Sequence, residues 1–483
     1  MKKSKIFFVT AEVYPFVKGS RGSEFAGALP PYVQAHGPEV RVIMPKYSII
    51  NERKHIIRDI IRLKDIPITM PSGTFPVSIK SGFIPESKTQ IYFADSEKYF
   101  KRSDMLRDKR TGQFFKDNHE RLLFLAKSAI ETLRTLGWQP DIIHCCDWPT
   151  GLLPALVREE QQKGFLKKTV VTFSITDFHE LGLFEKSFAS KVFASSSVIE
   201  TEDCVHKNKF SFLKCALKYS DAVSIVDIHK YLTDLGKPNP DFEGILKSVK
   251  SISEVPFAGD HGLWNPASNN TLYKTFTSEK LERKQTNKED FIEDKRTGFS
   301  AEQPILGILA EDIENQHKSI AQFLKAVRDQ SLQIFILGDK NPSSYSTIKS
   351  LIQKNANHKV YTLQDPDDYF RPNFFAVSDF LWIPVTDKFS ELYYFNAVRY
   401  GCIPVVPKQA YAAGYFDGIK DRGGNALVYQ DDHDLARKIE SGLAVFETKT
   451  QWESLVKRLM KSDVSLGKHL APYIKWYEKA LAK

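Results

Sequence analysis

The sequence predicts an α/β protein made of two doubly wound parallel-sheet domains. Two series of short apolar runs, each run followed by a helical pattern, occupy the first 235 residues and residues 304–450. This alternation is typical of a parallel sheet with helices on both faces. A stretch rich in Pro, Asn, Lys and Glu separates the two series. The chain has 483 residues, which is too long for one ordinary domain and comfortable for two.

The first series opens with a β-turn-α-β pattern. The run KIFFVTAE at 5–12 is apolar and rich in β-branched and aromatic residues, and a glycine-containing turn at 18–22 follows it. Next comes a helical pattern that Pro30-Pro31 is expected to break, and then the strand-like run EVRVIMPKY at 39–47. This order is typical of a nucleotide-type parallel sheet. Further strands are predicted at 90–95, 141–147, 168–175 and 221–227, with helices at 117–136 and 207–219.

The second series gives six more strands and is followed by closing helices. The strands are predicted at 304–310, 333–338, 359–363, 379–385, 402–406 and 426–430, and the helices at 318–329, 343–354, 390–400 and 432–446. The predicted division is a first domain at 1–235, an inter-domain region at 236–303 that is partly helical in 278–296, a second domain at 304–450 and closing helices at 451–483. Two such domains are expected to hold a ligand in a cleft at the carboxyl ends of their strands.

Composition excludes several classes of protein. Hydrophobic residues make up 42% and charged residues 26%, which are globular fractions. The net charge of +9 is spread along the chain in short clusters mixed with acids, so we expect a solvated surface suited to an anionic ligand and no nucleic-acid binding. The five cysteines form no metal pattern, and neither a metal nor a cofactor is predicted. Reduced cysteines and the lack of a signal-peptide core or membrane span predict a cytoplasmic protein.

Several residues that could act in catalysis or binding could equally have a purely structural role. His144 lies in the predicted strand 141–147 and is more typical of a satisfied core histidine than of a catalyst. Asp147-Trp148 could cap and pack the start of a helix. Lys18 could be an ordinary surface residue of a turn.

The order and spacing of several stretches carry a resemblance to a known family. The chain is similar to bacterial glycogen synthases and plant starch synthases, which transfer glucose from ADP-glucose to an α-1,4-glucan. This resemblance implies the GT-B architecture of two Rossmann-like domains. The matching stretches are PFVK (15–18), GALP (27–30), EVRVIMPKY (39–47), EKYFKR (97–102), PDIIHCCDW (140–148), NKFSFLKCALKYSDAVSIV (208–226), LWNPA (263–267), RYGCIPVV (399–406) and DVSLGKHLAPYIKWYEKAL (463–481).

In the first domain, the resemblance assigns site positions that this chain fills only in part. The family's Lys-Thr-Gly-Gly-Leu corresponds to Lys18 and the four residues after it, where Ser20-Arg21 replace the double glycine. Glu24 takes the place of the family's Asp. Asp147 matches the Asp of His-Cys-His-Asp-Trp, and Thr176 occupies the position of a histidine that contacts the transferred sugar. The resemblance thus makes Glu24 and Asp147 the candidate catalytic residues and Lys18 a donor-binding residue.

In the second domain, the positions that the resemblance assigns to the nucleotide donor are mostly substituted. Glu311 stands at the family's Arg and Gln316 at its Lys, the two cations that clamp the diphosphate. Lys388 stands at a key Glu, with Glu391 three residues later, and Ala410-Tyr411 replace the Gly-Gly of a phosphate-binding turn. Because negative charge develops on the departing diphosphate, cations aimed at it stabilise the transition state. Unit charges about 4 Å apart interact by roughly 4 kcal/mol at an effective dielectric near 20, so these losses total several kcal/mol.

The residues leave two functions open. One is a glycogen-synthase homologue that is inactive or strongly impaired as a transferase and acts by binding an α-glucan or a partner, such as a working synthase. The other is an active glycosyltransferase with an altered donor or acceptor, for which Lys18, Glu24 and Asp147 are the retained residues. An α-glucan or an ADP-glucose-like molecule is the expected ligand, and neither nucleic acid nor a membrane is an expected partner.

Overall fold

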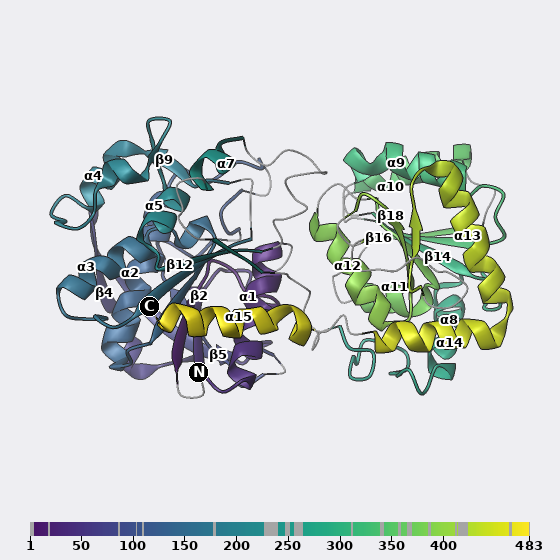
Figure 1. Ribbon diagram of the computed structural model, residues 1–483, viewed down its shortest axis with the longest axis horizontal. Coiled ribbons are helices and arrows are strands. Elements are labelled where there is room, and N and C mark those ends of the chain that lie inside the picture. The colour runs from purple at the N-terminus through teal and green to yellow at the C-terminus, as the bar shows by residue number, and fades with distance from the viewer. Residues whose placement is uncertain are drawn as a thin grey trace. The chain divides into compact units, whose positions relative to one another are not determined.

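The chain folds into two compact units, each built on a parallel β-sheet (Figure 1). The first unit comprises Met1–Leu232, Gly236–Asp260 and Leu466–Lys483, and the second comprises Thr233–Leu235 and His261–Ser465. The computed structural model describes all residues except 1–3, 18–19, 86, 103, 109–110, 177–179, 227–239, 247–251, 256–263, 311–312, 339–341, 356–358, 365–369, 385–387, 411–412, 414–423, 463–465 and 483.

The first unit has a sheet in which seven neighbouring strands are parallel and an antiparallel edge follows. In spatial order, the parallel strands are β13 (Ile252–Val255), β12 (Ala222–Val226), β8 (Val170–Ile175), β7 (Ile142–Cys146), β1 (Lys5–Val9), β2 (Glu39–Pro45) and β6 (Gln90–Asp95). The antiparallel edge consists of β5 (Gly73–Phe83), β3 (Arg58–Asp59) and β4 (Ile66–Met70). The parallel strands β1, β2, β6, β7, β8 and β12 confirm the sequence prediction, whereas the antiparallel edge was not predicted.

Helices and a small second sheet complete the first unit. Its α-helices are α1 (Arg21–Ala35), α2 (Asn118–Leu136), α3 (Leu153–Gln162), α4 (Lys186–Val192), α5 (Phe212–Tyr219), α7 (Pro240–Leu246) and α15 (Leu466–Leu481). The 3-10 turns are η1 (Ile61–Leu63), η2 (Trp148–Thr150) and η3 (Thr201–Cys204), and the small antiparallel sheet consists of β9 (Leu183–Glu185), β10 (Val205–His206) and β11 (Lys209–Ser211).

The expected break at Pro30-Pro31 is wrong, because α1 continues through both prolines to Ala35. A proline inside a helix removes one backbone hydrogen bond and usually kinks or ends it. Here one face of the helix is anchored in the core, where Phe25 and Leu29 are fully buried. Burial of this face outweighs the two missing hydrogen bonds, so packing decides the conformation.

The second unit contains a six-stranded parallel sheet. Its spatial order is β16 (Val360–Gln364), β15 (Gln333–Gly338), β14 (Ile305–Ala310), β17 (Phe380–Trp382), β18 (Ile403–Pro407) and β19 (Leu427–Tyr429). Its helices are α8 (Glu282–Lys295), α9 (Ile313–Ala326), α10 (Pro342–Asn355), α11 (Arg371–Val377), α12 (Lys388–Arg399), α13 (Asp432–Glu447) and α14 (Lys449–Lys461). All six strands were predicted, because each is a buried or half-buried apolar run.

The two units divide the chain differently from the predicted domain boundaries. The region 236–303 is shared, because β13 adds the last parallel strand to the first sheet, whereas α8 belongs to the second unit. The closing helices 451–483 are shared as well, since α14 lies in the second unit and α15 in the first. Figure 1 shows α15, in yellow, lying across the first unit, where it contacts α1, β8 and β13.

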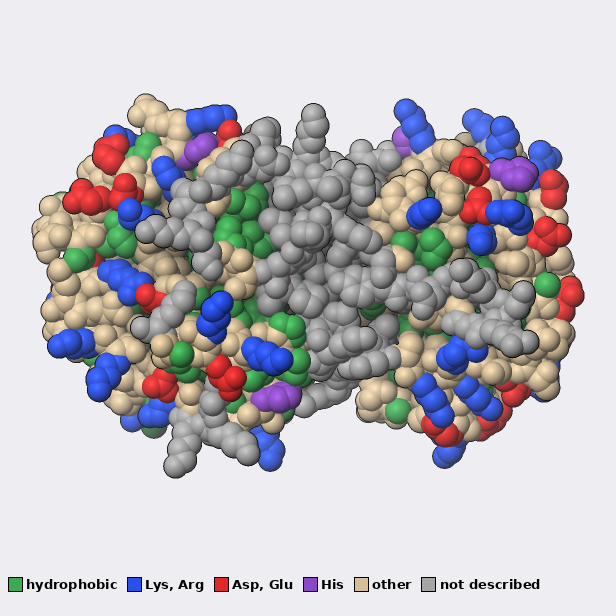
Figure 2. Space-filling view, viewed as in Figure 1, with side chains coloured by type: hydrophobic (Ala, Val, Ile, Leu, Met, Phe, Trp, Pro, Cys, Tyr) green, Lys and Arg blue, Asp and Glu red, His purple; other side chains and the backbone are tan. Residues whose placement is uncertain are grey.

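The described surface carries mixed charge. In the face shown in Figure 2, basic and acidic side chains are interspersed over the described part of both units. Among the described residues, no helix is both long enough and apolar enough to cross a membrane.

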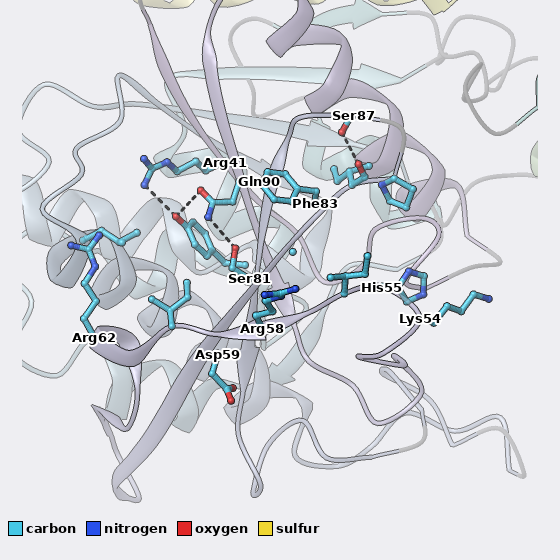
Figure 3. Close-up of a pocket in the computed structure, with 17 residues that line it drawn as sticks. Arg41, Lys54, His55, Arg58, Asp59, Arg62, Ser81, Phe83, Ser87 and Gln90 are labelled. Carbon is cyan, nitrogen blue, oxygen red and sulfur yellow. Dashed lines mark hydrogen bonds between the residues drawn. The ribbon is translucent and has the colours of Figure 1, made fainter. Parts of the chain in front are cut away.

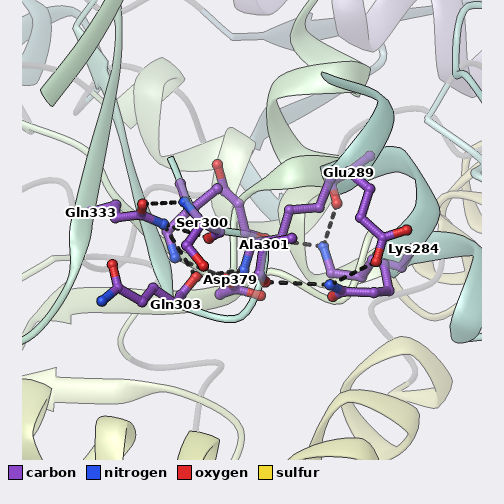
Figure 4. A network of polar contacts seen from close by, with 12 residues as sticks. Lys284, Glu289, Ser300, Ala301, Gln303, Gln333 and Asp379 are labelled. Carbon is purple, nitrogen blue, oxygen red and sulfur yellow. Dashed lines mark hydrogen bonds and ion pairs between the residues drawn. The ribbon is translucent and has the colours of Figure 1, made fainter. Parts of the chain in front are cut away.

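A buried ion pair fixes α8 to the second sheet (Figure 4). The Lys288 ammonium lies 2.8 Å from Asp379 Oδ2, and the two side chains are only 3% and 6% exposed. The same carboxylate oxygen accepts a hydrogen bond from the backbone N–H of Ile305 at the start of β14, at 2.8 Å. Lys288 also donates to the carbonyl of Gln303 at 2.7 Å. Asp379 therefore joins the helix to the amino end of the central strand.

We expect Asp379→Asn to lower the free energy of unfolding by about 3–5 kcal/mol, because it leaves the Lys288 ammonium buried without its counter-charge. Urea denaturation would measure this loss. The double variant Asp379→Asn/Lys288→Met should recover part of it, because no buried charge remains. A single variant as stable as the unchanged protein would show that the pair contributes nothing.

Candidate functional site

Each parallel sheet has one point at which the strand order reverses. In the first sheet, β1 lies between β2 and β7, and in the second sheet, β14 lies between β15 and β17. In open α/β sheets, ligands bind outside the carboxyl ends of the strands at this switch point. The candidate site residues of each unit are therefore expected just after β1, β7 and β8 in the first sheet, and just after β14 and β17 in the second.

Four residues converge at the switch point of the first sheet. Glu12 follows β1, Asp147 follows β7, Thr176 follows β8, and Gly22 lies in the first turn of α1. A Cβ atom at Gly22 would come within 2.7 Å of Glu12 Oε1, 3.0 Å of Asp147 Oδ2 and 3.4 Å of Thr176 Oγ1. The absence of a side chain at Gly22 thus allows the helix start to approach two carboxylates closely.

Asp147 is held by backbone and side-chain hydrogen bonds. One carboxylate oxygen accepts from the backbone N–H of Thr176 at 2.6 Å, and the other accepts from the Thr176 hydroxyl. The Asp147 N–H donates to the carbonyl of Ser174 at 2.9 Å. Asp147 has φ 58° and ψ 169°, a conformation that is costly for any residue except glycine. These hydrogen bonds fix the carboxylate in a buried position, with the residue 8% exposed.

The structural alternative for Asp147-Trp148 was that these residues cap and pack the start of a helix. The packing by Trp148 is observed, whereas the cap by Asp147 is not. The turn η2 begins at Trp148, yet the Asp147 side chain makes no capping hydrogen bond to it. The indole of Trp148 instead packs against Phe114 and Phe184, at ring-centroid distances of 5.7 and 6.2 Å. The carboxylate is directed to the N–H and the hydroxyl of Thr176 instead.

Of the other residues predicted for the first unit's site, the structure places Glu24 but not Lys18. Glu24 is 8% exposed and lies in the first turn of α1, where the helix dipole favours a negative charge. The hydroxyl of Ser20 caps this helix by accepting from the N–H of Ser23 at 2.9 Å. Lys18 and the side chain of Arg21 lie outside the described residues. Glu12 was not predicted, although its place directly after the first strand was a signal that could have found it.

His144 is a core residue of the first unit. Its ring stacks on Phe8 with centroids 4.0 Å apart, and its Nδ1 lies 2.8 Å from the Tyr477 hydroxyl of α15 and 3.1 Å from Thr172 Oγ1. Complete burial holds the pKa of His144 well below its usual range, so the ring is neutral. The interpretation of this residue as a core histidine is confirmed for its burial, but the ring is not fully satisfied, because Nε2 is buried with no hydrogen-bond partner among the described residues.

At the switch point of the second sheet, Gln316 is directed into the protein. It lies in α9, is 1% exposed, and its Nε2 donates to the carbonyl of Pro384, just after β17, at 2.9 Å. Lys388 begins α12, but its side chain is outside the described part of the structure, as are Glu311 and Tyr411. Of the predicted donor positions, Gln316 and Ala410 can therefore be placed.

Ala410 lines a cavity of about 690 Å³ at the carboxyl ends of β17, β18 and β19. One wall is aromatic, because Trp382 stacks on Phe323 with centroids 3.9 Å apart and donates its indole N–H to the Tyr429 hydroxyl at 2.9 Å. Burial raises the pKa of Tyr429 to about 12, so it remains protonated. Asp431 and Asp432 also line the cavity, and its described lining includes no lysine or arginine.

Comparison with known proteins decides the family. The family model for the starch synthase catalytic domain matches residues 5–247, just over half of the chain. The chain belongs to the starch synthase catalytic domain family. Curated relatives of this starch synthase family member include the glycogen synthases of Chlorobaculum parvum and Chlorobaculum tepidum. Each is 29% identical, and each match covers 99% of this chain and 99% of the relative.

Solved structures show the fold of this starch synthase family member. The catalytic domain of Starch Synthase IV from Arabidopsis thaliana, bound to ADP and acarbose, matches with a TM-score of 0.79 and 20% identity, covering 99% of this chain and all of that one. Sucrose-phosphate synthase from Thermosynechococcus elongatus matches with a TM-score of 0.53 and 13% identity, covering 99% of each chain. The predicted GT-B fold is confirmed.

We expect Thr176→Val to lower the free energy of unfolding by about 1.5–3 kcal/mol, because it removes a hydrogen bond to a buried carboxylate while keeping the shape of the side chain. Thr176→Ser keeps the hydroxyl and is the matched control, for which the loss should be clearly smaller. Urea denaturation of the two variants side by side would measure the difference. Equal stabilities would contradict the assigned hydrogen bond.

Stability of this starch synthase family member should fall in acid because of His144. Its pKa is lowered in the folded state, so below about pH 6.5 the unfolded chain binds more protons than the folded one. The free energy of unfolding then falls by up to about 1.4 kcal/mol per pH unit from this residue. Unfolding measured between pH 7 and pH 5 should show a shallower slope for His144→Phe. The exposed His36, changed to Gln, is the control; a slope unchanged in His144→Phe would refute this assignment.

Proposed function

We propose that this protein binds an α-glucan and has lost most or all of the family's glucosyl transfer from ADP-glucose. The hydrogen bond from Thr176 to Asp147 is the observation that carries the proposal. By the family resemblance, position 176 belongs to a histidine that contacts the transferred sugar. A threonine whose hydroxyl is committed to Asp147 offers no imidazole to a sugar.

The described donor positions support the same proposal. A leaving diphosphate needs cations aimed at it, and Gln316, at the position that the resemblance assigns to a lysine, is neutral and bonded to the carbonyl of Pro384. The cavity beside Ala410 presents Asp431 and Asp432, whose charges would repel a phosphate. The sequence adds Glu311 at the position of the family's arginine.

Binding of a glucan, directly or beside a partner synthase, is the role that remains for such a fold. Support comes from the Starch Synthase IV neighbour, which was bound to ADP and acarbose. We also infer a cytoplasmic location, which is consistent with five buried cysteines that all remain free thiols.

The second candidate is an active glycosyltransferase with an altered donor or acceptor. It is favoured by Glu12 and Asp147, two carboxylates that approach the start of α1 at the switch point. Such an enzyme should be stabilised by one of a panel of nucleotide sugars in a thermal-shift measurement. Stabilisation by none of them would argue against this candidate.

A transferase assay with ADP-glucose and glycogen tests the proposal. We expect a rate at least about 10³-fold below that of the Chlorobaculum parvum glycogen synthase assayed in parallel, because loss of one electrostatic donor already costs about 10²–10³ in rate. Co-sedimentation with glycogen should still detect binding. Turnover comparable with that relative, or no retention by glycogen, would overturn the proposal.

Restoring the substituted groups should raise the rate. We expect the triple variant Thr176→His/Glu311→Arg/Gln316→Lys to transfer glucose at least about tenfold faster than the unchanged protein. Gln353→Lys adds the same charge as Gln316→Lys on an exposed position of α10 and should change nothing. A higher transfer rate in both the triple variant and Gln353→Lys would indicate a general effect of added charge rather than restoration of the site.

A further inference from the structure

A second concave site lies in the first unit, at the antiparallel edge of its sheet (Figure 3). The cavity has a volume of about 880 Å³. It lies over one face of β2, β3, β5 and β6 and extends to η1. Arg41 lies near the amino end of β2, four residues before the strand ends at Pro45, whereas the candidate site residues Glu12, Asp147 and Thr176 follow the carboxyl ends of β1, β7 and β8.

The two residues of β3, Arg58 and Asp59, both line the cavity but have different partners. Arg58 pairs with Ser81, and both line the cavity. The next residues, Asp59 and Lys80, pair on the opposite face, where Lys80 Nζ lies 3.4 Å from Asp59 Oδ1. Figure 3 shows the side chains of Arg58 and Asp59 leaving the strand in different directions. Asp59 also lines the cavity, but its carboxylate is paired with Lys80, so the cations of the lining remain in excess.

The floor of the cavity is a connected row of polar groups. Arg41 donates to the Tyr92 hydroxyl at 3.2 Å, and Tyr92 donates to the amide oxygen of Gln90 at 3.1 Å. The amide nitrogen of Gln90 then donates to Ser81 Oγ at 2.9 Å. Glu39 holds Arg41 from the other side at 2.8 Å. This row orders the floor before any ligand arrives.

Three guanidinium groups from separate elements approach this floor. Arg41 comes from β2, Arg58 from β3 and Arg62 from η1. The charges of Arg41 and Arg62 both act against the burial that raises the pKa of Tyr92. The described lining has four Lys or Arg side chains and one carboxylate, that of Asp59.

The mouth of the cavity is apolar. Phe83 and Ile56 line it with 58% and 68% of their surfaces exposed, which is high for such large side chains. An exposed aromatic ring beside cations and hydroxyl groups suits a ligand that is part ring and part anion.

We propose that this cavity binds a sugar phosphate, with its phosphate held by Arg58 and Arg62 over the Tyr92–Gln90–Ser81 floor and its ring packed on Phe83. Arginine matches phosphate because its planar fork donates two parallel hydrogen bonds. This binding site is separate from the proposed glucan and donor sites and does not depend on their activity.

Titration calorimetry of the full chain with glucose 1-phosphate at low ionic strength tests the proposal. We expect saturable binding that weakens at least about tenfold in the double variant Arg58→Gln/Arg62→Gln, since each charge-assisted contact to phosphate contributes a tenfold factor or more. Arg53→Gln removes an exposed arginine of the same segment that does not line the cavity, and should bind normally. Asp147→Asn should also bind normally, which separates this site from the transfer site.

Three results would overturn the proposal. One is no binding of glucose 1-phosphate, and another is binding that the double arginine variant leaves unchanged while Asp147→Asn removes it. The third is equal affinity for inorganic phosphate or for a neutral malto-oligosaccharide, because the sugar ring and the phosphate would then not both contribute to binding. Weaker binding after Phe83→Ala, with circular dichroism unchanged, would support the assigned platform.

Discussion

The carboxylate of Asp147, bound by the N–H and the hydroxyl of Thr176, is the interaction on which the first unit's site depends. It ties the ends of β7 and β8 together, and the carboxylate lies so close to the start of α1 that a Cβ atom at Gly22 would come within 3.0 Å of it. Asp147 occupies a backbone conformation that costs about 1–3 kcal/mol. Hydrogen bonds to a charged group, each contributing about 1.5–3 kcal/mol, are strong enough to offset that strain.

Much of the fold could be predicted because its strands are buried on both faces. The runs at 90–95 and 333–338 coincide with β6 and β15, since a parallel strand covered by helices is a continuous apolar run. The antiparallel edge at 58–83 was missed because polar residues and Pro67 and Pro76 interrupt the run. The strand β13 was missed because it lies in a polar stretch and gains its stability from pairing with β12.

The sequence and the family resemblance proposed residues for the candidate site but could not give their contacts. Asp147 was assigned from the family resemblance, and Glu12 was not assigned, although each of them follows a strand, β7 and β1 respectively. Asp147 and Glu12 come together because β7 and β1 are neighbours where the strand order reverses. The order of the strands in a sheet cannot be predicted from the sequence of one strand alone. The hydrogen bond between Thr176 and Asp147, 29 residues apart, likewise follows only from that order.

The two switch points share one property that bears on the proposed loss of donor chemistry. At each of them, a side chain at a ligand-binding position of the family is bonded to the protein's own groups, Thr176 to Asp147 and Gln316 to the carbonyl of Pro384. A cation waiting for a phosphate is a buried charge without a partner when the ligand is absent, and this destabilises the fold. A neutral donor with an internal acceptor removes that cost. Substitutions of this kind stabilise the scaffold while weakening ligand recognition, so the proposed loss of transfer and the retention of the fold would follow from the same change.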